Sequence, residues 1–265
     1  MHYHGIDSAL LACPDLDAAR AAYGRLGLTV GQASAGQRSL RVGDFTLYVL
    51  ADTGAPLAEP LAAALAAGRG LFAVALGVPD LPTAVRRLRG RGVRAVTSPS
   101  VAWLGVAEQA GLDLLLVERP EPTPPPAHRF PLRRLDHLAA VAHDLDARCR
   151  FWEDVLGVRA ACEVVTPTMV IRQLRIGDAT LELLGPASVD SPIHQRPAGL
   201  VGMASWEVPD LDEAVRQARA AGFTPSDPAA GPLPGTRIST IPGTDLAGVN
   251  MQLLQYVCPA GEAGQ

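Results

Sequence analysis

Two polar side chains interrupt apolar segments in the second half of the chain. His137 lies inside the run 135–141, and Glu182 stands between Leu181 and Leu183. A buried carboxylate is costly unless it is paired or bound to a metal, and histidine is a common metal ligand. The two residues therefore indicate either a site for a divalent metal ion or a metal-free pocket in which the histidine pairs with the glutamate.

Four basic residues are candidates for binding a substrate near such a site. Arg172 and Arg237 lie on expected strands and could bind a substrate carboxylate, and the alternative for each is an exposed arginine. His194 and Arg196 lie on the loop Gly185–Gly199, GPASVDSPIHQRPAG. Loops of this kind often cover sites, so both side chains could reach an anionic ligand or the metal; the alternative is a surface loop without a role.

The segment Leu135–Gly157, LDHLAAVAHDLDARCRFWEDVLG, must position His137. Its apolar start predicts a strand, and strand alternation places His137 on one face with Leu135, Ala139 and Val141. Asp144 can then accept backbone N–H groups as a helix N-cap. Apolar residues follow at helical spacing: Leu145, Cys149, Trp152 and Leu156. Gly157 can end the helix in the left-handed conformation, so the unit is a strand, a turn and a helix.

This unit occurs four times. The turns are Pro14-Asp15-Leu16-Asp17, Pro79-Asp80-Leu81-Pro82, His143-Asp144-Leu145-Asp146 and Pro209-Asp210-Leu211-Asp212, and their first aspartates are 65, 64 and 66 residues apart. Strand-like runs follow each helix; after the third they are Met169–Ile176 and Ala179–Leu184, joined at the hairpin pair Gly177-Asp178. The period predicts an α+β fold of four βαβββ modules.

A βαβββ module used in pairs resembles the vicinal oxygen chelate superfamily. That superfamily includes glyoxalase I, methylmalonyl-CoA epimerase, extradiol dioxygenases, and the fosfomycin and bleomycin resistance proteins. The resemblance covers residues 4–118 and 132–257 and implies two tandem glyoxalase-like domains. We expect a first domain at 1–118, a proline-rich linker at 119–131, a second domain at 132–257 and a tail at 258–265.

The resemblance also implies four inward-facing positions in the second domain, which are occupied by His137, Glu182, Met203 and Gln252. His137, Glu182 and Gln252 together imply a divalent metal site, for Zn²⁺, Mn²⁺, Ni²⁺, Co²⁺ or Fe²⁺. The thioether of Met203 is a poor ligand for such ions. By alternation Ser205 shares the face of Met203 and is a candidate for substrate binding. Glu182 or Glu207 is the candidate base.

The first domain lacks an equivalent set. Its hairpin LRVGDFTLYVL aligns without gaps with LRIGDATLELL of the third module, which places Tyr48 at the position of Glu182. Ser8, Ala73 and Leu115 occupy the other three positions. These residues do not make a metal site, so the first domain is expected to be structural or to bind something without metal. We predict that any metal or ligand site lies within residues 132–257.

Composition excludes several classes of function. The 265 residues, 48% of them hydrophobic, suit two globular domains, and a net charge of −4 without basic and aromatic clusters argues against a nucleic-acid partner. No apolar run is long enough to span a membrane, and the N-terminus lacks a signal-peptide pattern, so we expect a cytoplasmic monomer or homodimer without a membrane partner. All 23 Lys and Arg residues are arginine, which excludes Schiff-base chemistry.

The leading interpretation is a metal-assisted enzyme acting on a small oxygen-bearing metabolite. The metal would stabilise an enolate or alkoxide during an isomerase- or lyase-type reaction. One alternative is a non-catalytic protein that sequesters a drug or another small molecule. Another is a relative of the ring-cleaving dioxygenases, whose His-His-Glu triad would be represented here by His137 alone.

Overall fold

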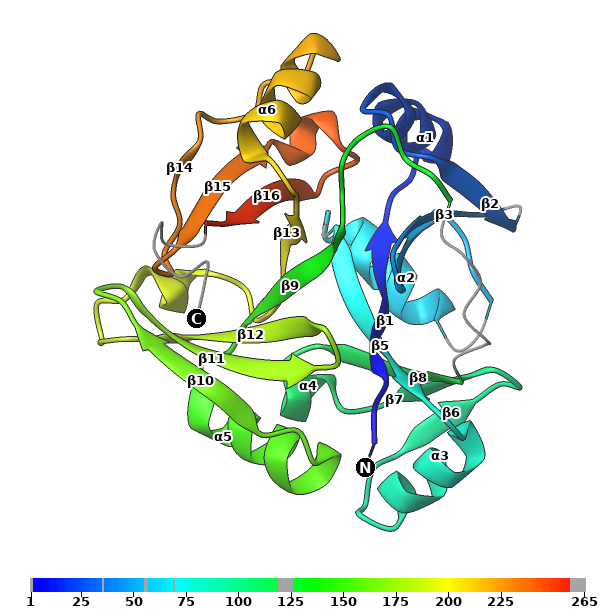
Figure 1. Cartoon of the computed structure of the whole chain (residues 1–265). Helices are drawn as coiled ribbons and strands as arrows, with labels where there is room; N and C mark the ends of the chain where they lie inside the picture. The colour runs from blue at the N-terminus through cyan, green and yellow to red at the C-terminus, as the bar shows by residue number, and fades with distance from the viewer. Residues whose placement is uncertain (1, 35, 55–56, 69, 119–125, 258–265) are drawn as a thin grey trace, which may run out of the picture.

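The computed structural model describes residues 2–34, 36–54, 57–68, 70–118 and 126–257. Two eight-stranded mixed sheets make up the fold, the first on the right of Figure 1 and the second on the left. The elements form four βαβββ modules, which confirms the α+β prediction. The tail 258–265 and linker residues 119–125 lie outside the described residues.

Modules one and two build the first sheet. Its elements are β1 (Gly5–Ala12), α1 (Leu16–Arg25), β2 (Val30–Ser34), β3 (Gln37–Val42), β4 (Phe45–Leu50), α2 (Ala58–Ala66), β5 (Leu71–Val78), α3 (Leu81–Arg89), β6 (Ala95–Thr97), β7 (Val101–Leu104), α4 (Ala107–Ala110) and β8 (Asp113–Glu118). The strand order is β2-β3-β4-β1-β5-β8-β7-β6. The central strands β1 and β5 are antiparallel, and each runs parallel to the last strand of its own module.

Modules three and four repeat this topology. Their elements are β9 (Arg134–Val141), α5 (Leu145–Arg150), the π-helical η1 (Phe151–Leu156), β10 (Ala160–Val165), β11 (Met169–Ile176), β12 (Ala179–Pro186), the 3-10 helix η2 (Pro192–Gln195), β13 (Gly199–Glu207), α6 (Leu211–Ala220), β14 (Ala229–Ala230), β15 (Thr236–Ile241), the 3-10 helix η3 (Gly243–Asp245) and β16 (Asn250–Tyr256). The order is β10-β11-β12-β9-β13-β16-β15-β14, so β9 and β13 take the central places of β1 and β5.

The repeated aspartates start the four module helices. Asp15, Asp80, Asp144 and Asp210 each accept a hydrogen bond from the backbone N–H three residues further on, at 2.8–3.0 Å. Each carboxylate also lies at the positive end of its helix, which stabilises the helix start. Gly157 ends η1 at φ 79°, as predicted. The repeat in the sequence is therefore a repeat of helix caps.

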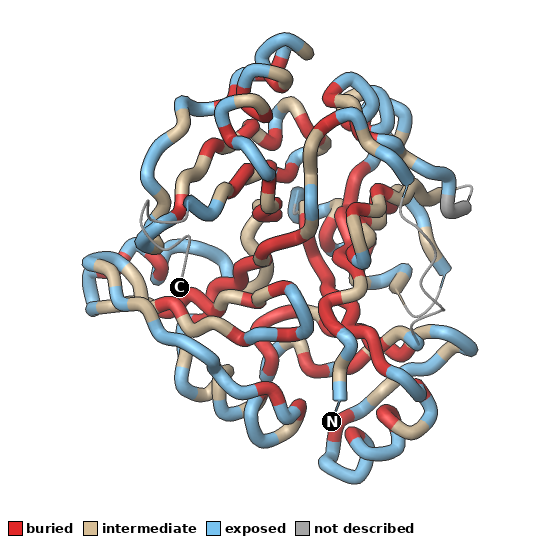
Figure 2. Tube along the Cα trace, in the orientation of Figure 1, coloured by how far each residue is buried: buried red, intermediate tan, exposed pale blue. Residues whose placement is uncertain are grey.

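The two domains share one continuous apolar core. Figure 2 shows the buried residues concentrated along the central strands and between the sheets. Phe45 of the first domain packs edge-to-face on Trp206 of the second, with ring centroids 5.5 Å apart. Trp152 Nε1 donates to the Ala110 carbonyl at 3.0 Å, again between domains. The domains are therefore joined by packing as well as by the linker.

The face of each sheet opposite this core is covered only in part. In the first domain α2 lies there, with Leu61 and Ala64 buried against the sheet. In the second domain η2 takes the same role, with Ile193 at 1% exposure. Both covering elements come from the connector between two modules. Each leaves a cavity beside it.

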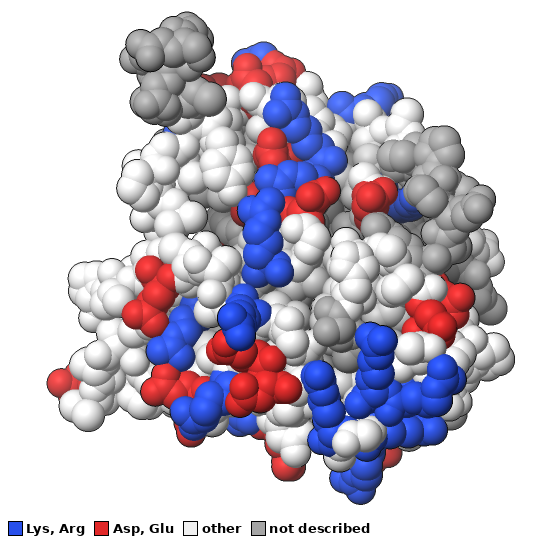
Figure 3. All heavy atoms as spheres, turned by 60° about the horizontal axis from the view of Figure 1, so that its bottom comes forward, with Lys and Arg blue, Asp and Glu red and all other residues white. Residues whose placement is uncertain are grey.

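The outer surface carries the run of arginines around α3. Arg86, Arg87 and Arg89 of α3 are exposed, and so are Arg91 and Arg94 after it. Figure 3 shows basic side chains gathered on this side of the molecule. Within the described ranges, no helix is both long and apolar enough to cross a membrane.

Candidate active site

A β-bulge in β9 turns two consecutive side chains to the open face of the second sheet. Ser205 pairs with His137 and Trp206 with Leu135, which leaves Asp136 as the extra residue. Asp136 and His137 therefore both line the cavity, whereas Leu135 is buried in the shared core. The prediction that Leu135 shares the face of His137 was wrong, because the bulge reverses the alternation at this point. Ala139 and Val141 do share that face.

His137 is held at both ring nitrogens. Its Nδ1 lies 2.8 Å from Asp136 Oδ1, and its Nε2 lies 2.8 Å from Ser205 Oγ. Tyr256 donates its hydroxyl to the other oxygen of Asp136, also at 2.8 Å. The imidazole is thus fixed in orientation, with Nδ1 donating to the carboxylate.

The same contacts set the charge states of the group. Burial alone would lower the pKa of His137, but the hydrogen bond to Asp136 and the charge of Glu182 outweigh it and raise that pKa above its usual value. Burial would raise the pKa of Asp136, but its hydrogen bonds with His137 and Tyr256 lower it instead. Burial and the bond to Asp136 raise the pKa of Tyr256 to about 12. The cluster therefore pairs an ionised aspartate with a readily protonated histidine.

Glu182 faces this histidine from the neighbouring strand. Its Oε2 lies 3.9 Å from His137 Nε2, and both side chains are only about one-seventh exposed, at 13% and 14%. Gln173 of β11 donates its amide to Glu182 Oε1 at 2.9 Å. Thr180 and Leu184 line the same cavity, as alternation along β12 predicts. Glu182 therefore presents one oxygen to His137 while Gln173 holds the other.

Ser205 joins His137 to Gln252. Its hydroxyl is 2.8 Å from His137 Nε2 and 2.9 Å from Gln252 Oε1, and the residue has 0% exposure. Two proton arrangements satisfy these contacts. Either an imidazolium donates to Ser205, which donates to the amide oxygen, or a turned Gln252 amide donates to Ser205, which donates to a neutral imidazole.

These groups lie in a cavity of about 300 Å³. Its walls are largely apolar and include Ala139, Val164, Met169, Ile171, Leu184, Val201, Met203, Leu233 and Leu254. Arg175 and Arg196 add two positive charges to the lining, and neither guanidinium is ion-paired with any residue that the structure describes. The cavity thus combines an apolar wall, a polar cluster and two arginines able to bind an anion.

Several candidates from the sequence do not line this cavity. Arg172 turns to the other side of β11, where it pairs with Glu163 and Asp146 at 2.8 and 2.6 Å. Arg237 makes two bonds with Asp212 at 2.8 and 2.9 Å.

The remaining two candidates lie near the ends of their elements. His194 is exposed and lies near the Ser188 carbonyl. Glu207 is at the end of β13, where Arg134 and Arg133 hold its carboxylate at 2.7 and 3.3 Å. Arg196 does line the cavity, and Ser205 lies beneath it.

Four residues of the cluster were missed from the sequence: Asp136, Gln173, Arg175 and Tyr256. For two of them the signal was present. The tight turn at Gly177 sets the register of β11 and β12, so that Gln173 pairs with Glu182 and Arg175 with Thr180. Counting back from the turn places Arg175, and not Arg172, on the cavity face.

The donor set fits a divalent metal ion in part. Ligand atoms about 2.0–2.2 Å from one Zn²⁺ lie up to about 4 Å apart, and His137 Nε2 and Glu182 Oε2 meet this condition at 3.9 Å. With Asp136 on Nδ1, Nε2 would be the ligand atom, and the ion would have to displace Ser205 Oγ from it. The part of the chain that the structure describes holds no group of three His, Cys, Asp or Glu side chains suited to a metal, so the third ligand would be the neutral oxygen of Gln252.

Residues 134–251 match the model of the family described as the Glyoxalase/Bleomycin resistance protein/Dioxygenase superfamily. The match covers the second domain, where the resemblance inferred from the sequence is confirmed. None of the curated protein sequences matches the chain.

Two solved structures show the same tandem fold over nearly the whole chain. A mutant of 4-hydroxymandelate synthase from Streptomyces coelicolor is 17% identical, with a TM-score of 0.66 over 98% of this chain and 95% of that one. A fusion of a xylose isomerase-like TIM barrel with 4-hydroxyphenylpyruvate dioxygenase is 20% identical, with a TM-score of 0.69. This chain is covered to 99% in that match but spans only 50% of the fusion protein. A methylmalonyl-CoA epimerase variant from Streptomyces coelicolor is 26% identical over 48% of this chain and 99% of its own, with a TM-score of 0.42.

Proposed function

We propose that the second domain catalyses a metal-assisted isomerase- or lyase-type proton transfer on a small, oxygen-bearing anionic metabolite. The single observation that supports this most is the approach of His137 Nε2 and Glu182 Oε2 to 3.9 Å beside a cavity with apolar walls. His137, Glu182 and Gln252 would hold the ion. Once bound, it would polarise a substrate oxygen and stabilise negative charge on it.

The substrate would be anchored by the two arginines of the cavity. Arg175 and Arg196 could bind a carboxylate, and each such charge-assisted contact contributes about 1.5–3 kcal/mol. The cavity volume of about 300 Å³ limits the substrate to a compact metabolite. The apolar wall would exclude water from the reacting carbon.

Glu182 is the base in this proposal. It would take a proton from a carbon next to the substrate carbonyl and return it at the same or a neighbouring carbon. The amide of Gln173 holds Glu182 Oε1, so Oε2 alone faces the cavity and would leave the ion to act as the base. Glu207 is not proposed for this role, because Arg133 and Arg134 hold its carboxylate outside the cavity lining.

One observation favours a non-catalytic binding protein as the second candidate. His137, Ser205, Gln252 and Glu182 all have hydrogen-bond partners within the protein, so the cluster is complete without a metal. Such a pocket could hold a small molecule without changing it. The ring-cleaving alternative has less support, because Met203 and Gln252 replace two members of the required triad.

The test combines metal analysis with proton exchange. Untagged protein should contain about one divalent metal per chain, and His137→Ala should reduce it to background. Nuclear magnetic resonance in D₂O would follow deuterium incorporation into a panel of small 2-oxo acids and acyl thioesters. We expect exchange with the parent protein and none with Glu182→Gln.

Glu207→Gln is the matched control, because this carboxylate does not line the cavity, and its variant should exchange as the parent does. Tight binding of a panel member that is recovered without deuterium, by protein at background metal content, would contradict the enzyme and support the binding protein.

A further inference from the structure

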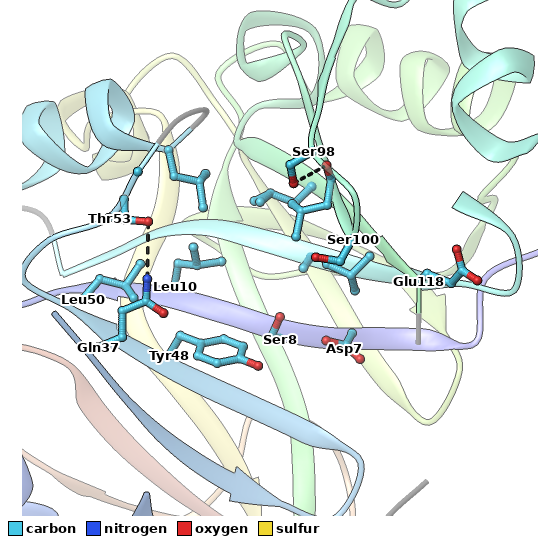
Figure 4. Close-up of a pocket in the computed structure, with 16 residues that line it drawn as sticks. Asp7, Ser8, Leu10, Gln37, Tyr48, Leu50, Thr53, Ser98, Ser100 and Glu118 are labelled. Atoms are coloured by element: carbon cyan, nitrogen blue, oxygen red, sulfur yellow. Dashed lines mark hydrogen bonds between the residues drawn. The ribbon is translucent and has the colours of Figure 1, made fainter. Parts of the chain in front are cut away.

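The first domain contains a cavity of about 490 Å³ at the place that corresponds to the candidate active site (Figure 4). The same β-bulge shapes it. Ser8 pairs with Ala75 and Ile6 with Leu76, so Asp7 is the extra residue and lines the cavity together with Ser8. The strand geometry that forms the site in the second domain is therefore repeated in the first.

Five residues with hydroxyl groups line this cavity, and two of them, Ser8 and Tyr48, lie on the neighbouring strands β1 and β4. Ser8 is 2% exposed, yet no hydrogen bond joins it to any residue in the described ranges, and its oxygen is not sealed inside the protein. Figure 4 shows the hydroxyl end of Tyr48 pointing toward Ser8. Burial, and then the negative charge of Asp7, raise the pKa of Tyr48, so its hydroxyl stays protonated and can donate. Because the Ser8 oxygen opens into the cavity without a protein partner, it can form a hydrogen bond with an oxygen of a bound ligand.

The rest of the lining combines seven apolar residues with Gln37, Thr53, Ser98 and Ser100. The apolar residues are Leu10, Leu50, Leu57, Ala75, Val101, Leu115 and Val117, and Leu57 directly precedes α2, which covers this face of the sheet. The positions of Gln252 and Ser205 are here Leu115 and Ala75. Of the three proposed metal ligands, Gln252 is thus replaced by a hydrocarbon side chain, and His137 and Glu182 are replaced by the hydroxyl-bearing Ser8 and Tyr48.

The charges at the cavity disfavour an anion. Asp7 and Glu118 line the cavity, and no arginine or histidine does so among the residues that the structure describes; Arg41, whose charge lowers the pKa of Tyr48, lies outside the lining. Glu118 also accepts the Leu81 N–H at the start of α3, which offsets part of its charge. The second-domain cavity differs, because Arg175 and Arg196 make it suited to anions.

We propose that the first-domain cavity is a metal-free binding site for an uncharged, mostly apolar small molecule that carries one hydroxyl or carbonyl group. The apolar part lies against the leucine and valine side chains, and the oxygen lies between Ser8 and Tyr48. Its volume accepts a molecule of at least two fused aromatic rings. This site is separate from the proposed active site and runs against our prediction that ligands bind only within residues 132–257.

The test is calorimetric titration of the full chain, in EDTA, with four probes of one size. These are 2-naphthol, naphthalene, 2-naphthoate and 2-naphthylmethylamine. We expect 2-naphthol to bind most tightly, about 3- to 10-fold better than naphthalene, which corresponds to one net hydrogen bond. The carboxylate should bind most weakly.

Two filling variants locate the site. Ala75→Phe occupies the first-domain cavity and should abolish 2-naphthol binding, whereas Ala139→Phe, its matched control in the second-domain cavity, should leave it unchanged. Tyr48→Phe keeps the ring and should bring the affinity for 2-naphthol close to that for naphthalene. This variant decides the result if circular dichroism shows that Ala75→Phe does not fold.

Three outcomes would overturn the proposal. One is the absence of 2-naphthol binding up to about 1 mM, which corresponds to a binding free energy weaker than about −4 kcal/mol. Another is loss of 2-naphthol binding in Ala139→Phe while Ala75→Phe keeps it, or while Tyr48→Phe keeps the full affinity of the parent protein. The third is tightest binding of either charged probe.

Discussion

Replacing Ser205 by alanine should reveal whether the polar cluster of the second domain competes with a metal. The hydroxyl satisfies His137 Nε2 and Gln252 Oε1 at 2.8 and 2.9 Å, and it is fully buried. Ser205→Ala removes both bonds without adding volume. Leaving buried polar atoms unpaired costs about 1–3 kcal/mol, and access to the cavity reduces this for two partly exposed groups. We therefore expect a loss of about 1–2 kcal/mol, or a fall in Tm of roughly 3–8 °C.

The same change should strengthen metal binding. In the parent protein a cation must displace Ser205 from both ligand atoms, whereas in Ser205→Ala these atoms are already free. The difference of about one net hydrogen bond corresponds to roughly tenfold in Zn²⁺ affinity. Thermal unfolding in EDTA and in Zn²⁺, with Zn²⁺ titration by calorimetry, measures both effects, because a ligand that binds only the folded protein raises Tm.

Ser239→Ala is the matched control. Ser239 is also a buried strand serine, at 1% exposure, and donates to the Ser226 carbonyl at 2.7 Å away from the cavity. Its variant should lose about 1 kcal/mol and respond to Zn²⁺ as the parent does. The reasoning fails if Zn²⁺ raises the Tm of Ser205→Ala no more than that of Ser239→Ala.

Three further changes test other contacts. Arg175→Gln should weaken the binding of an anionic ligand about 10- to 100-fold, as measured by calorimetry. Arg172→Gln, on the opposite face of β11, should leave this affinity unchanged. Equal effects of the two changes would contradict the faces assigned to the two arginines. Trp206→Ala should lower the free energy of unfolding in urea by about 3–5 kcal/mol, because the ring is 1% exposed and packs on Phe45 of the other domain. A decrease of less than about 1 kcal/mol would contradict the shared core. Asp136→Asn should lower Zn²⁺ affinity about 10- to 100-fold through loss of the carboxylate on His137, and an unchanged affinity would remove His137 from the ligand set.

The fold was predictable because its signals are local and repeated. An aspartate that caps a helix can be recognised within four residues, and four such caps at nearly constant spacing define the modules. Glu182 could also be singled out from the sequence, because burying a carboxylate between two leucines of a strand is unfavourable unless the carboxylate is paired. These inferences needed only the chain near each residue.

The cavity lining depended on strand pairing, which the sequence expresses less directly. A bulge adds one residue to one strand, so its position is set by the partner strand, and the face of Leu135 was assigned wrongly for that reason. Glu207 follows the alternation of β13, but the side chain is held by Arg133 and Arg134, whose positions depend on the fold. Comparison of the two domains does contain a hint, since Asp7-Ser8 and Asp136-His137 occupy the same place in their modules.

This repeated bulge explains how one architecture can carry two different cavities. In each domain it turns an aspartate and the residue after it to the open face of the sheet, beside the last strand of the same module. With His137 after the aspartate and Glu182 on the neighbouring strand, the result is a charged cluster near two arginines. With Ser8 and Tyr48 in those places, the same geometry gives neutral hydroxyls beside hydrocarbon. The backbone fixes where the side chains meet, and the residues at these two places set the difference between the proposed cation site and the proposed site for an uncharged molecule.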